Sequence, residues 1–375
     1  MKVRSVRRHG FTVRTSQAAK GIAILMMVFH HMFRAPELYE GYVVRFYPLA
    51  EYQVTQLFSY FKTCVGLFAF ITGYGLCKSW ERDMGSGGEW KSLYARFTAS
   101  HYAKLLRSFA LIFVLSAVIC QALDGATARA YFTGSSWIEN LMNLLMGFLG
   151  LYRIVGTGKL CAEWWYLSAH ILFIFLVPLL CVWMRRLGVL SLAFVLLALP
   201  RTISGGYPGG TVPLSFVAPM ATGAAFAYYG VFDRIHTFRV RYFTGSGLRR
   251  MGGAALAVCA VAVSCWLYIR LPVRLYWELS YTLPAVCILA ALNEYLPEDG
   301  LLSGALCFLG RHSMNIWLTH TLIRGYLMDF LYQQPHFILS CVSLLVISVL
   351  VSLAIEGIRA LLKQLVSFVY ARQGR

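Results

Sequence analysis

Residues 13–33 read VRTSQAAKGIAILMMVFHHMF, an apolar stretch about as long as a helix that crosses a bilayer core of roughly 30 Å. Two of its residues, Lys20 and His31, are polar where a lipid-facing helix is apolar. They lie about three helical turns apart, so their side chains share one helix face, roughly 16 Å apart along the axis. A charged side chain at the centre of a spanning helix costs about 2.5–3.5 kcal/mol, so such residues are candidates for function.

Apolar stretches of similar length recur along the 375-residue chain, which is 58% hydrophobic and 13% charged. A soluble domain is typically about half apolar and a quarter charged, so the composition predicts an all-α integral membrane protein. The pattern predicts one membrane domain over residues 13–366, between a basic cytoplasmic tail (1–12) and a second cytoplasmic tail (367–375). The net charge of +18 falls in short loops, which favours positive-inside topology over nucleic-acid binding. The ten cysteines lack metal-binding spacing and are typical of small buried apolar residues.

The apolar stretches give eleven candidate spans: 13–33, 54–77, 104–122, 138–151, 163–184, 187–200, 212–230, 251–269, 276–293, 301–322 and 337–366. If all eleven crossed, the basic loop 231–250 and Arg185-Arg186 would lie outside, against the positive-inside rule. Segment 138–151 is short for a span and is typical of an interfacial or re-entrant piece. Without it, every basic loop lies inside. We therefore predict a polytopic bundle of about ten transmembrane helices in the cell membrane, with both termini cytoplasmic. Segment 187–200 is also short and is the alternative non-crossing piece.

The spacing of Lys20 and His31 suits a ligand with an anionic end and a reactive end. Lys20 would meet the anion, and His31 could accept and return a proton, as acyl transfer requires. The alternative is that Lys20 extends to the inner interface and His31 is an interfacial polar residue. Lys104 and Arg107 lie one turn apart at the cytoplasmic end of the third span, 104–122, where they could bind phosphate groups or anchor the helix in the inner leaflet.

Two further stretches carry polar residues among apolar ones. CAEWWYLSAHILFIF (161–175) begins with Glu163, Trp165 and Tyr166 at a membrane entrance, where an aromatic belt is the alternative explanation. LGRHSMNIWLTH (309–320) places Ser313, Trp317 and His320 on one helix face. Arg311 and His312 precede them, which suggests a break in that helix. No Walker-type loop, GxSxG elbow or HExxH pair occurs, so the sequence predicts neither ATP-driven transport nor a metal site.

At these positions the chain resembles the acyltransferase 3 family of membrane acyltransferases, in particular its fucose 4-O-acetylase-like branch. Lys20 and His31 match the family's basic residue, ten intervening residues and histidine. GLFAFITGYGL (66–76), HYAKLLRSFALIF (101–113), EWWYLSAHILFIFLVP (163–178) and LGRHSMNIWLTHTLI (309–323) resemble later family motifs in the same order. Three positions depart from the usual residues. Thr72 replaces serine, Lys104 replaces arginine and Trp317 replaces tyrosine.

The resemblance implies transfer of an acyl group, usually acetyl, from cytoplasmic acyl-CoA to a hydroxyl of an extracytoplasmic sugar, glycan or glycolipid, without a bound cofactor. It assigns catalysis to His31, either by direct transfer or through a brief acyl-histidine, and donor binding to Lys20, Lys104 and Arg107. The residues then expected to line the cavity are Glu163, Trp165, Tyr166, Ser313, Trp317 and His320.

Two other functions stay open at this stage. The first is a transporter or exporter of a small polar or glycolipid substrate, with the histidines as proton relays, although we find no internal repeat. The second is a membrane scaffold, which leaves Lys20, His31 and His320 without a role. The acceptor, the acyl group and the oligomeric state do not follow from the sequence.

Overall fold

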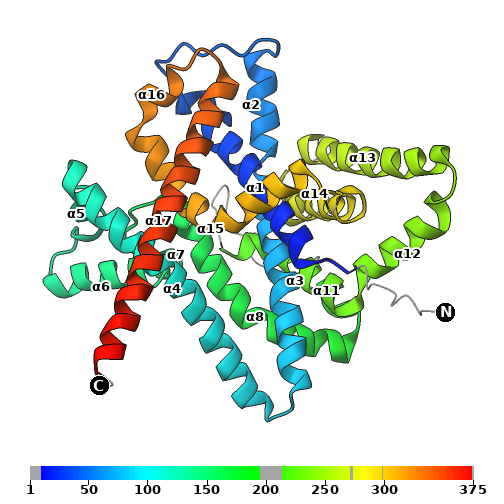
Figure 1. The fold of residues 1–375 in the computed structure, drawn as a ribbon, viewed down its shortest axis with the longest axis horizontal. Coiled ribbons are helices and arrows are strands. Elements are labelled where there is room, and N and C mark those ends of the chain that lie inside the picture. Colours follow the sequence, from blue (N-terminus) through cyan, green and yellow to red (C-terminus); the bar gives the residue numbers. More distant parts are fainter. Residues whose placement is uncertain (1–9, 195–212, 271–272, 298, 374–375) are drawn as a thin grey trace.

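The structure is a computed structural model, and it describes residues 10–194, 213–270, 273–297 and 299–373 (Figure 1). Within these ranges the chain forms helices and no β-strand. The predicted tail 1–12 and segment 187–200 are therefore described only in part.

The helices follow one another in the order α1 Val13–Phe33, η1 Pro36–Leu38, α2 Glu51–Tyr60, α3 Thr63–Gly85, α4 Trp90–Asp124, α5 Ala126–Tyr131, α6 Trp137–Phe148, α7 Tyr152–Val155, η2 Ala162–Trp164, α8 Trp165–Leu187, α9 Leu190–Ala193, η4 Pro213–Phe216, α11 Val217–Tyr229, α12 Val231–Phe243, α13 Gly247–Arg270, α14 Val273–Tyr295, α15 Leu301–Tyr326, α16 Met328–Tyr332 and α17 Phe337–Gln373.

Among the described residues, five segments are long and apolar enough to cross a membrane. They are Glu51–Gly85, Trp90–Asp124, Ala162–Leu187, Gly247–Tyr268 and Phe337–Val369. Many of their large apolar side chains are exposed, for example Val258 and Trp266 on α13 and Leu350 on α17. Exposed apolar surface of this extent requires an apolar surrounding. The chain is thus an all-helical membrane protein.

Several predicted boundaries are close to those in the structure. The first predicted span, 13–33, coincides with α1. The predicted span 54–77 is divided into α2 and α3, with Thr63 Oγ1 donating to the Tyr60 carbonyl where the chain bends. Segment 138–151 overlaps α6, a helix of 12 residues that begins at Trp137. At 1.5 Å per residue it is about 18 Å long, which is too short to cross a bilayer core as a helix.

Helices α1 and α15 pack closely because glycines face the partner's backbone. A Cβ atom added at Gly21 would overlap the carbonyl oxygen of Leu306, and one at Gly310 would overlap that of Gln17. Small residues let membrane helices approach in this way, since packing and weak Cα–H···O contacts replace the hydrophobic effect between helices in lipid.

The two helices run in the same direction. Near their N-terminal ends the Cys307 thiol contacts the Arg14 carbonyl oxygen at 3.5 Å. Near their C-terminal ends the rings of His31 and His320 lie 4.9 Å apart between centroids. Pairing at both ends fixes the register of α15 against α1, so His31 and His320 meet at one level.

The predicted break in the 301–322 helix is wrong, because α15 is continuous from Leu301 to Tyr326. The polar residues there are accommodated without breaking the helix. His312 Nδ1 lies 2.8 Å from Ser352 Oγ on α17, and the Arg311 side chain is exposed. A polar partner on a neighbouring helix thus removes the need for an opening in the backbone.

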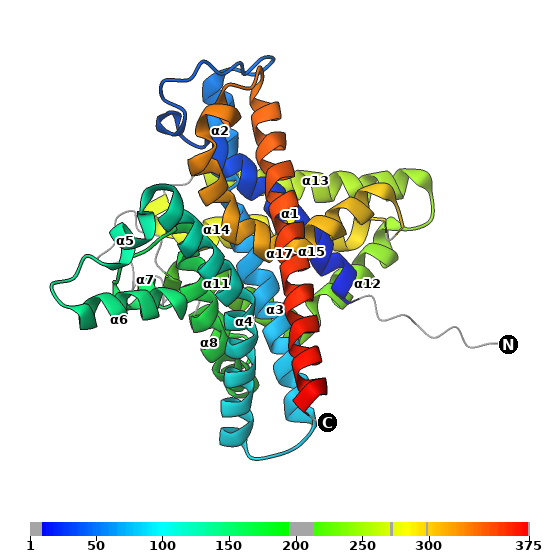
Figure 2. The ribbon, with the colours of Figure 1, turned by 60° about the vertical axis from the view of Figure 1, so that its left-hand side comes forward.

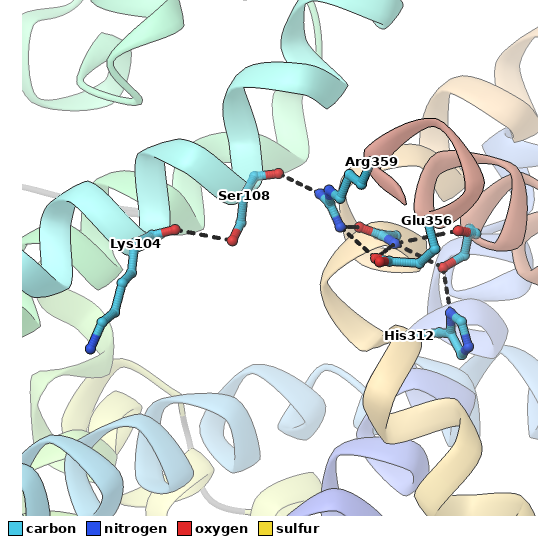
Figure 3. A network of polar contacts seen from close by, with 7 residues as sticks. Lys104, Ser108, His312, Glu356 and Arg359 are labelled. Atoms are coloured by element: carbon cyan, nitrogen blue, oxygen red, sulfur yellow. Dashed lines mark hydrogen bonds and ion pairs between the residues drawn. The ribbon is translucent and has the colours of Figure 1, made fainter. Parts of the chain in front are cut away.

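His312 belongs to a polar network that joins α15, α17 and α4 (Figure 3). The buried Asn315 amide donates to Glu356 Oε1 at 2.9 Å and to Ser352 Oγ at 3.0 Å. Arg359 donates to Asn315 Oδ1 at 3.0 Å and to the Ser108 carbonyl on α4 at 2.7 Å. The network therefore attaches the long helix α17, which lies along the outside of the bundle in Figure 2, to two helices behind it.

Replacing Asn315 with alanine should destabilise the protein by about 1–2 kcal/mol, because interhelical hydrogen bonds in membranes contribute about 0.6 kcal/mol on average and up to about 1.7. The measurement is the apparent Tm of the purified protein in detergent. Gln364→Ala, at an exposed position of α17, is the control and should leave the Tm nearly unchanged. An Asn315→Ala protein with the wild-type Tm would show that the network does not stabilise the bundle.

The buried apolar side chains form two main clusters. One gathers around α3, α4, α8 and α11, and the other around α1, α2, α14 and α17. Val65, Phe68 and Trp317 are partly buried and pack against both clusters. The boundary between the clusters is where the candidate site lies.

Candidate active site

A cavity of about 330 Å³ opens at the boundary between the two clusters, and Val65, Phe68 and Trp317 are part of its wall. Its walls come from α1, the α2–α3 junction, α7, the segment before α8, the start of α8 and α15. The lining residues that carry polar groups or aromatic rings are His30, His31, Arg34, Lys62, Phe68, Tyr152, Arg153, Lys159, Glu163, Trp165, Tyr166 and Trp317.

Two consecutive histidines near the end of α1 take different positions. His30 is buried, and its Nδ1 lies 2.8 Å from the Phe58 carbonyl oxygen on α2. Because a carbonyl only accepts, Nδ1 of His30 carries the proton and the ring is held against α2. The His31 side chain is 17% exposed. A polar ring in the wall of a cavity, with part of its surface accessible, is available to a ligand.

Glu163 is the acidic residue that faces His31. Its Oε1 lies 3.8 Å from His31 Nδ1, and its side chain is 18% exposed. The distance is longer than a hydrogen bond, yet a proton taken up by His31 would be stabilised by the nearby carboxylate. Glu163 lies in η2, which the neighbouring Trp164 anchors by donating its Nε1–H to the Leu318 carbonyl on α15 at 2.8 Å. This bond holds Glu163 opposite the end of α1.

His320 supports the His31 ring from α15. It is fully buried, and its Nδ1 lies 2.8 Å from the Trp317 carbonyl oxygen, so Nδ1 carries the proton. Its Nε2 lies 3.2 Å from Thr321 Oγ1, whose hydroxyl then donates to it. The centroids of the His31 and His320 rings are 4.9 Å apart, so His31 packs against His320 and also lies near Glu163. The three side chains come from α1, α15 and η2, far apart in sequence.

The predicted cavity lining is only partly found at this cavity. Glu163, Trp165, Tyr166 and Trp317 line it, and the rings of Tyr166 and Trp317 meet edge to face at 5.5 Å. His320 does not line it, because its ring is turned toward its own helix backbone beneath His31. Ser313 does not line the cavity either, since it lies about two helical turns before His320 on α15.

The three predicted donor-binding residues lie away from this cavity. Lys20 lies about three turns before His31 on α1 and is close enough to His170 on α8 to interact with it electrostatically. Lys104 and Arg107 are exposed on α4. In Figure 3 the Lys104 ammonium points away from the Arg359 network, while its carbonyl accepts from Ser108. The N-terminal half of α1, which carries Lys20, thus lies away from the cavity that holds His31.

Sequence reasoning missed several residues that line the cavity, among them Arg34, Lys62, Arg153 and Lys159. All lie at helix ends or in connecting segments, where basic residues are expected as interfacial anchors. A usable signal was present, because in the ten-span topology Arg34, Arg153 and Lys159 fall on the outer side, where lysine and arginine are depleted, and Lys62 falls within the second span. Tyr152 was also missed. It lies in α7, burial raises the pKa of its phenol, and its hydroxyl donates to the Ala162 carbonyl at 2.7 Å.

In a comparison with known families, residues 16–357 match the family model Acyl_transf_3, described as an acyltransferase domain. The chain belongs to the acyltransferase 3 family. It is therefore an acyltransferase enzyme. No curated protein and no solved structure gave a significant match.

The segments that resemble acyltransferase 3 motifs meet at the cavity. His31 comes from the first motif, the start of α8 from a later one, and Trp317 from the last. The α4 motif with Lys104 and Arg107 is the exception, since those side chains lie elsewhere. An acyltransferase needs a group that can take a proton from the acceptor, and in this cavity His31 has the required chemistry and exposure.

Proposed function

We propose that this acyltransferase moves an acyl group, most simply acetyl, from cytoplasmic acyl-CoA to a hydroxyl of an extracytoplasmic sugar. The observation that carries the proposal is the position of His31 in the cavity wall, 3.8 Å from the Glu163 carboxylate and in contact with the His320 ring. A histidine close to a carboxylate is a common arrangement for proton transfer in acyl transfer.

The proposed reaction uses His31 as the general base. Its imidazole takes the proton from the acceptor hydroxyl as that oxygen attacks the thioester carbonyl. The carbon–sulfur bond then breaks, and the CoA thiolate leaves and recovers the proton. The Glu163 carboxylate stabilises the imidazolium that forms between these two steps. His320 holds the orientation of the ring by packing against it.

The direction of the helices supports the ten-span topology. Because α1 and α15 run parallel, an odd number of crossings separates them. Eight apolar segments lie between them in the sequence, so at least one does not cross. The short helix α6 is suited to be the segment that does not cross.

Figures 1 and 2 both place the turn between α3 and α4 and the C-terminal end of α17 at one end of the molecule, with α2 and α16 at the other. Both basic segments 78–104 and 359–373 then share the cytoplasmic side.

Polar residues on the other side of His31 support a donor route. Lys20 on α1, His170 on α8, His101 on α4 and Lys104 follow one another at distances short enough for the positive charge of one to disfavour protonation of the next histidine. These residues connect α1 with the exposed face of α4. We propose that the phosphates of acyl-CoA bind along this series while the thioester reaches His31.

The test uses inside-out membrane vesicles that contain the protein, supplied with acetyl-CoA labelled in the acetyl group. We expect label in glycans or glycolipids that face the vesicle lumen, and none without the protein. A transporter would instead move its substrate across these vesicles without acyl-CoA. Donor-independent transport together with unlabelled glycans would therefore contradict the proposed function.

Glu163→Gln should reduce acyl transfer about tenfold, because the neutral amide stabilises an imidazolium less than a carboxylate does. The measurement is the rate of label transfer at saturating donor. Glu89→Gln, at the exposed N-terminal end of α4, is the matched control and should retain the wild-type rate. A Glu163→Gln rate equal to that of the control would remove Glu163 from the mechanism.

A further inference from the structure

The cavity that holds His31 is strongly cationic. Four of its lining residues, Arg34, Lys62, Arg153 and Lys159, carry positive charges, and Glu163 carries the negative charge among them. Cavities lined mainly by one sign of charge raise the local concentration of ligands of the opposite sign. The proposed function does not by itself require this charge, because a neutral sugar hydroxyl would suffice for acyl transfer.

The four cations come from separate parts of the chain. Arg34 directly follows α1, Lys62 lies between α2 and α3, Arg153 is in α7, and Lys159 is in the segment before η2. Arg34, Arg153 and Lys159 are exposed, and Lys62 is half-buried with its ammonium 5.9 Å from the centre of the Tyr281 ring. Like charges from four segments repel one another where they converge, so an anion bound among them would be stabilised.

Positive-inside bias does not explain these residues. In the proposed topology Arg34, Arg153 and Lys159 lie on the extracytoplasmic side, where that bias depletes lysine and arginine, and Lys62 lies within the second span. CoA phosphates are also a poor explanation for them. The donor arrives from the Lys20 side of α1, whereas Arg34 lies beyond His31 at the opposite end of the helix. The cations therefore face the acceptor.

Aromatic rings line the same cavity. Tyr152, Trp165, Tyr166 and Trp317 form part of its wall, and such rings pack against the apolar faces of sugars. Its volume of about 330 Å³ is at the lower end of the range for small-molecule sites. This suits one sugar unit with its charged substituent rather than a long stretch of polymer.

We propose that the acceptor is an anionic carbohydrate, one that carries a carboxylate or phosphate near the hydroxyl to be acylated. The cations would hold the anionic group, the aromatic rings would hold the sugar, and the free hydroxyl would then lie against His31. This inference rests on the proposed function and specifies its substrate class.

The first experiment tests the acceptor itself. Purified protein in detergent is given labelled acetyl-CoA and envelope glycans prepared in three ways: native, with carboxylates chemically reduced to alcohols, and with phosphates removed. We expect transfer to the native glycan and a loss of at least about tenfold after one of the two treatments, which identifies the anion. Equal transfer to all three preparations would overturn the anionic acceptor while leaving the acyltransferase intact. No transfer to any of them would count against the proposed function, on which the inference rests.

The second experiment separates the acceptor from the CoA phosphates. The double variant Arg153→Gln with Lys159→Gln is compared with Lys91→Gln with Arg96→Gln, which removes the same charges from an exposed face of α4. We expect the first pair to raise the KM for the acceptor about tenfold or more at a similar kcat, and the second pair to behave as wild type.

Both variants are also assayed with a phosphate-free acetyl thioester of N-acetylcysteamine. If the cations bind the acceptor, the defect of the Arg153 and Lys159 variant persists with this donor. A defect that appears only with acetyl-CoA would show that the cations bind the donor phosphates and would overturn the proposal. Elution of each variant as a single species in size-exclusion chromatography shows that it is folded.

Discussion

His31→Ala is expected to reduce acyl transfer about 10³-fold, because general base catalysis contributes about 10²- to 10⁴-fold and this cavity offers His31 for that role. Alanine removes the imidazole that lies 3.8 Å from the Glu163 carboxylate and packs against the His320 ring, and with it the proposed proton acceptor. The measurement is the rate of label transfer from acetyl-CoA to the glycan acceptor at saturating concentrations of both.

Two further variants test whether the loss of activity comes from removing a proton acceptor. His31→Gln keeps a side chain that can donate and accept hydrogen bonds but cannot take up a proton, so it should be as inactive as alanine. His336→Ala, in the segment between α16 and α17, removes a histidine that contacts the Tyr47 carbonyl, and it should retain most of the activity. An alanine variant of His31 that transfers acyl groups within about threefold of wild type would exclude the general-base role.

The sequence predicted the elements of this site better than their contacts. The spacing of Lys20 and His31 correctly placed both on one helix, and the predicted ends of that helix coincide with those of α1. Length and apolar composition are local properties, so they can be obtained from the chain alone. The side of α1 that faces the cavity, and the separation of Lys20 from it, depend on helices far away in sequence.

Contacts between distant segments explain what was missed. Glu163 was predicted as a residue at a membrane entrance, but its position opposite His31 results from the bond between Trp164 and the Leu318 carbonyl. The same reason accounts for the wrong break in α15. The polar pair Arg311 and His312 suggested an opening, and only the fold shows that Ser352 on α17 is within hydrogen-bond distance of the histidine. A single sequence without relatives does not indicate such pairs.

The four cations of the cavity show a second reason why the site could not be predicted fully from the sequence. Each was visible in the sequence, but none was selected as a candidate site residue. Their significance comes from convergence on one cavity, and for Arg34, Arg153 and Lys159 also from lying on the side of the membrane where the charge bias predicts few basic residues. Charge counted per loop against the predicted topology would have drawn attention to the three that lie on the outer side.

Gly310→Ala is expected to abolish the folded enzyme or to reduce its activity by orders of magnitude. The added Cβ atom would overlap the Gln17 carbonyl oxygen, which belongs to a helix backbone and has no flexible end that can move aside. The clash therefore has to separate α1 from α15. Because His31 is carried by α1 and His320 by α15, the same movement separates the two rings that form the site.

The measurement is the yield and apparent Tm of the protein in detergent, followed by acyl transfer for whatever material is folded. Gly304→Ala is the matched control, since it lies on the same helix and its added Cβ atom has no neighbouring atom within 4 Å. That variant should be neutral or slightly stabilising, because alanine favours a helix over glycine by about 1 kcal/mol.

Gly21→Ala should behave like Gly310→Ala, since its Cβ atom would overlap the Leu306 carbonyl from the other side of the same contact. If Gly310→Ala and Gly304→Ala were equally stable and active, the close approach of α1 and α15 would not be what places His31 against His320. Loss in both Gly310→Ala and Gly21→Ala, with Gly304→Ala intact, would show that the packing of two parallel helices sets the geometry of the acyltransferase site.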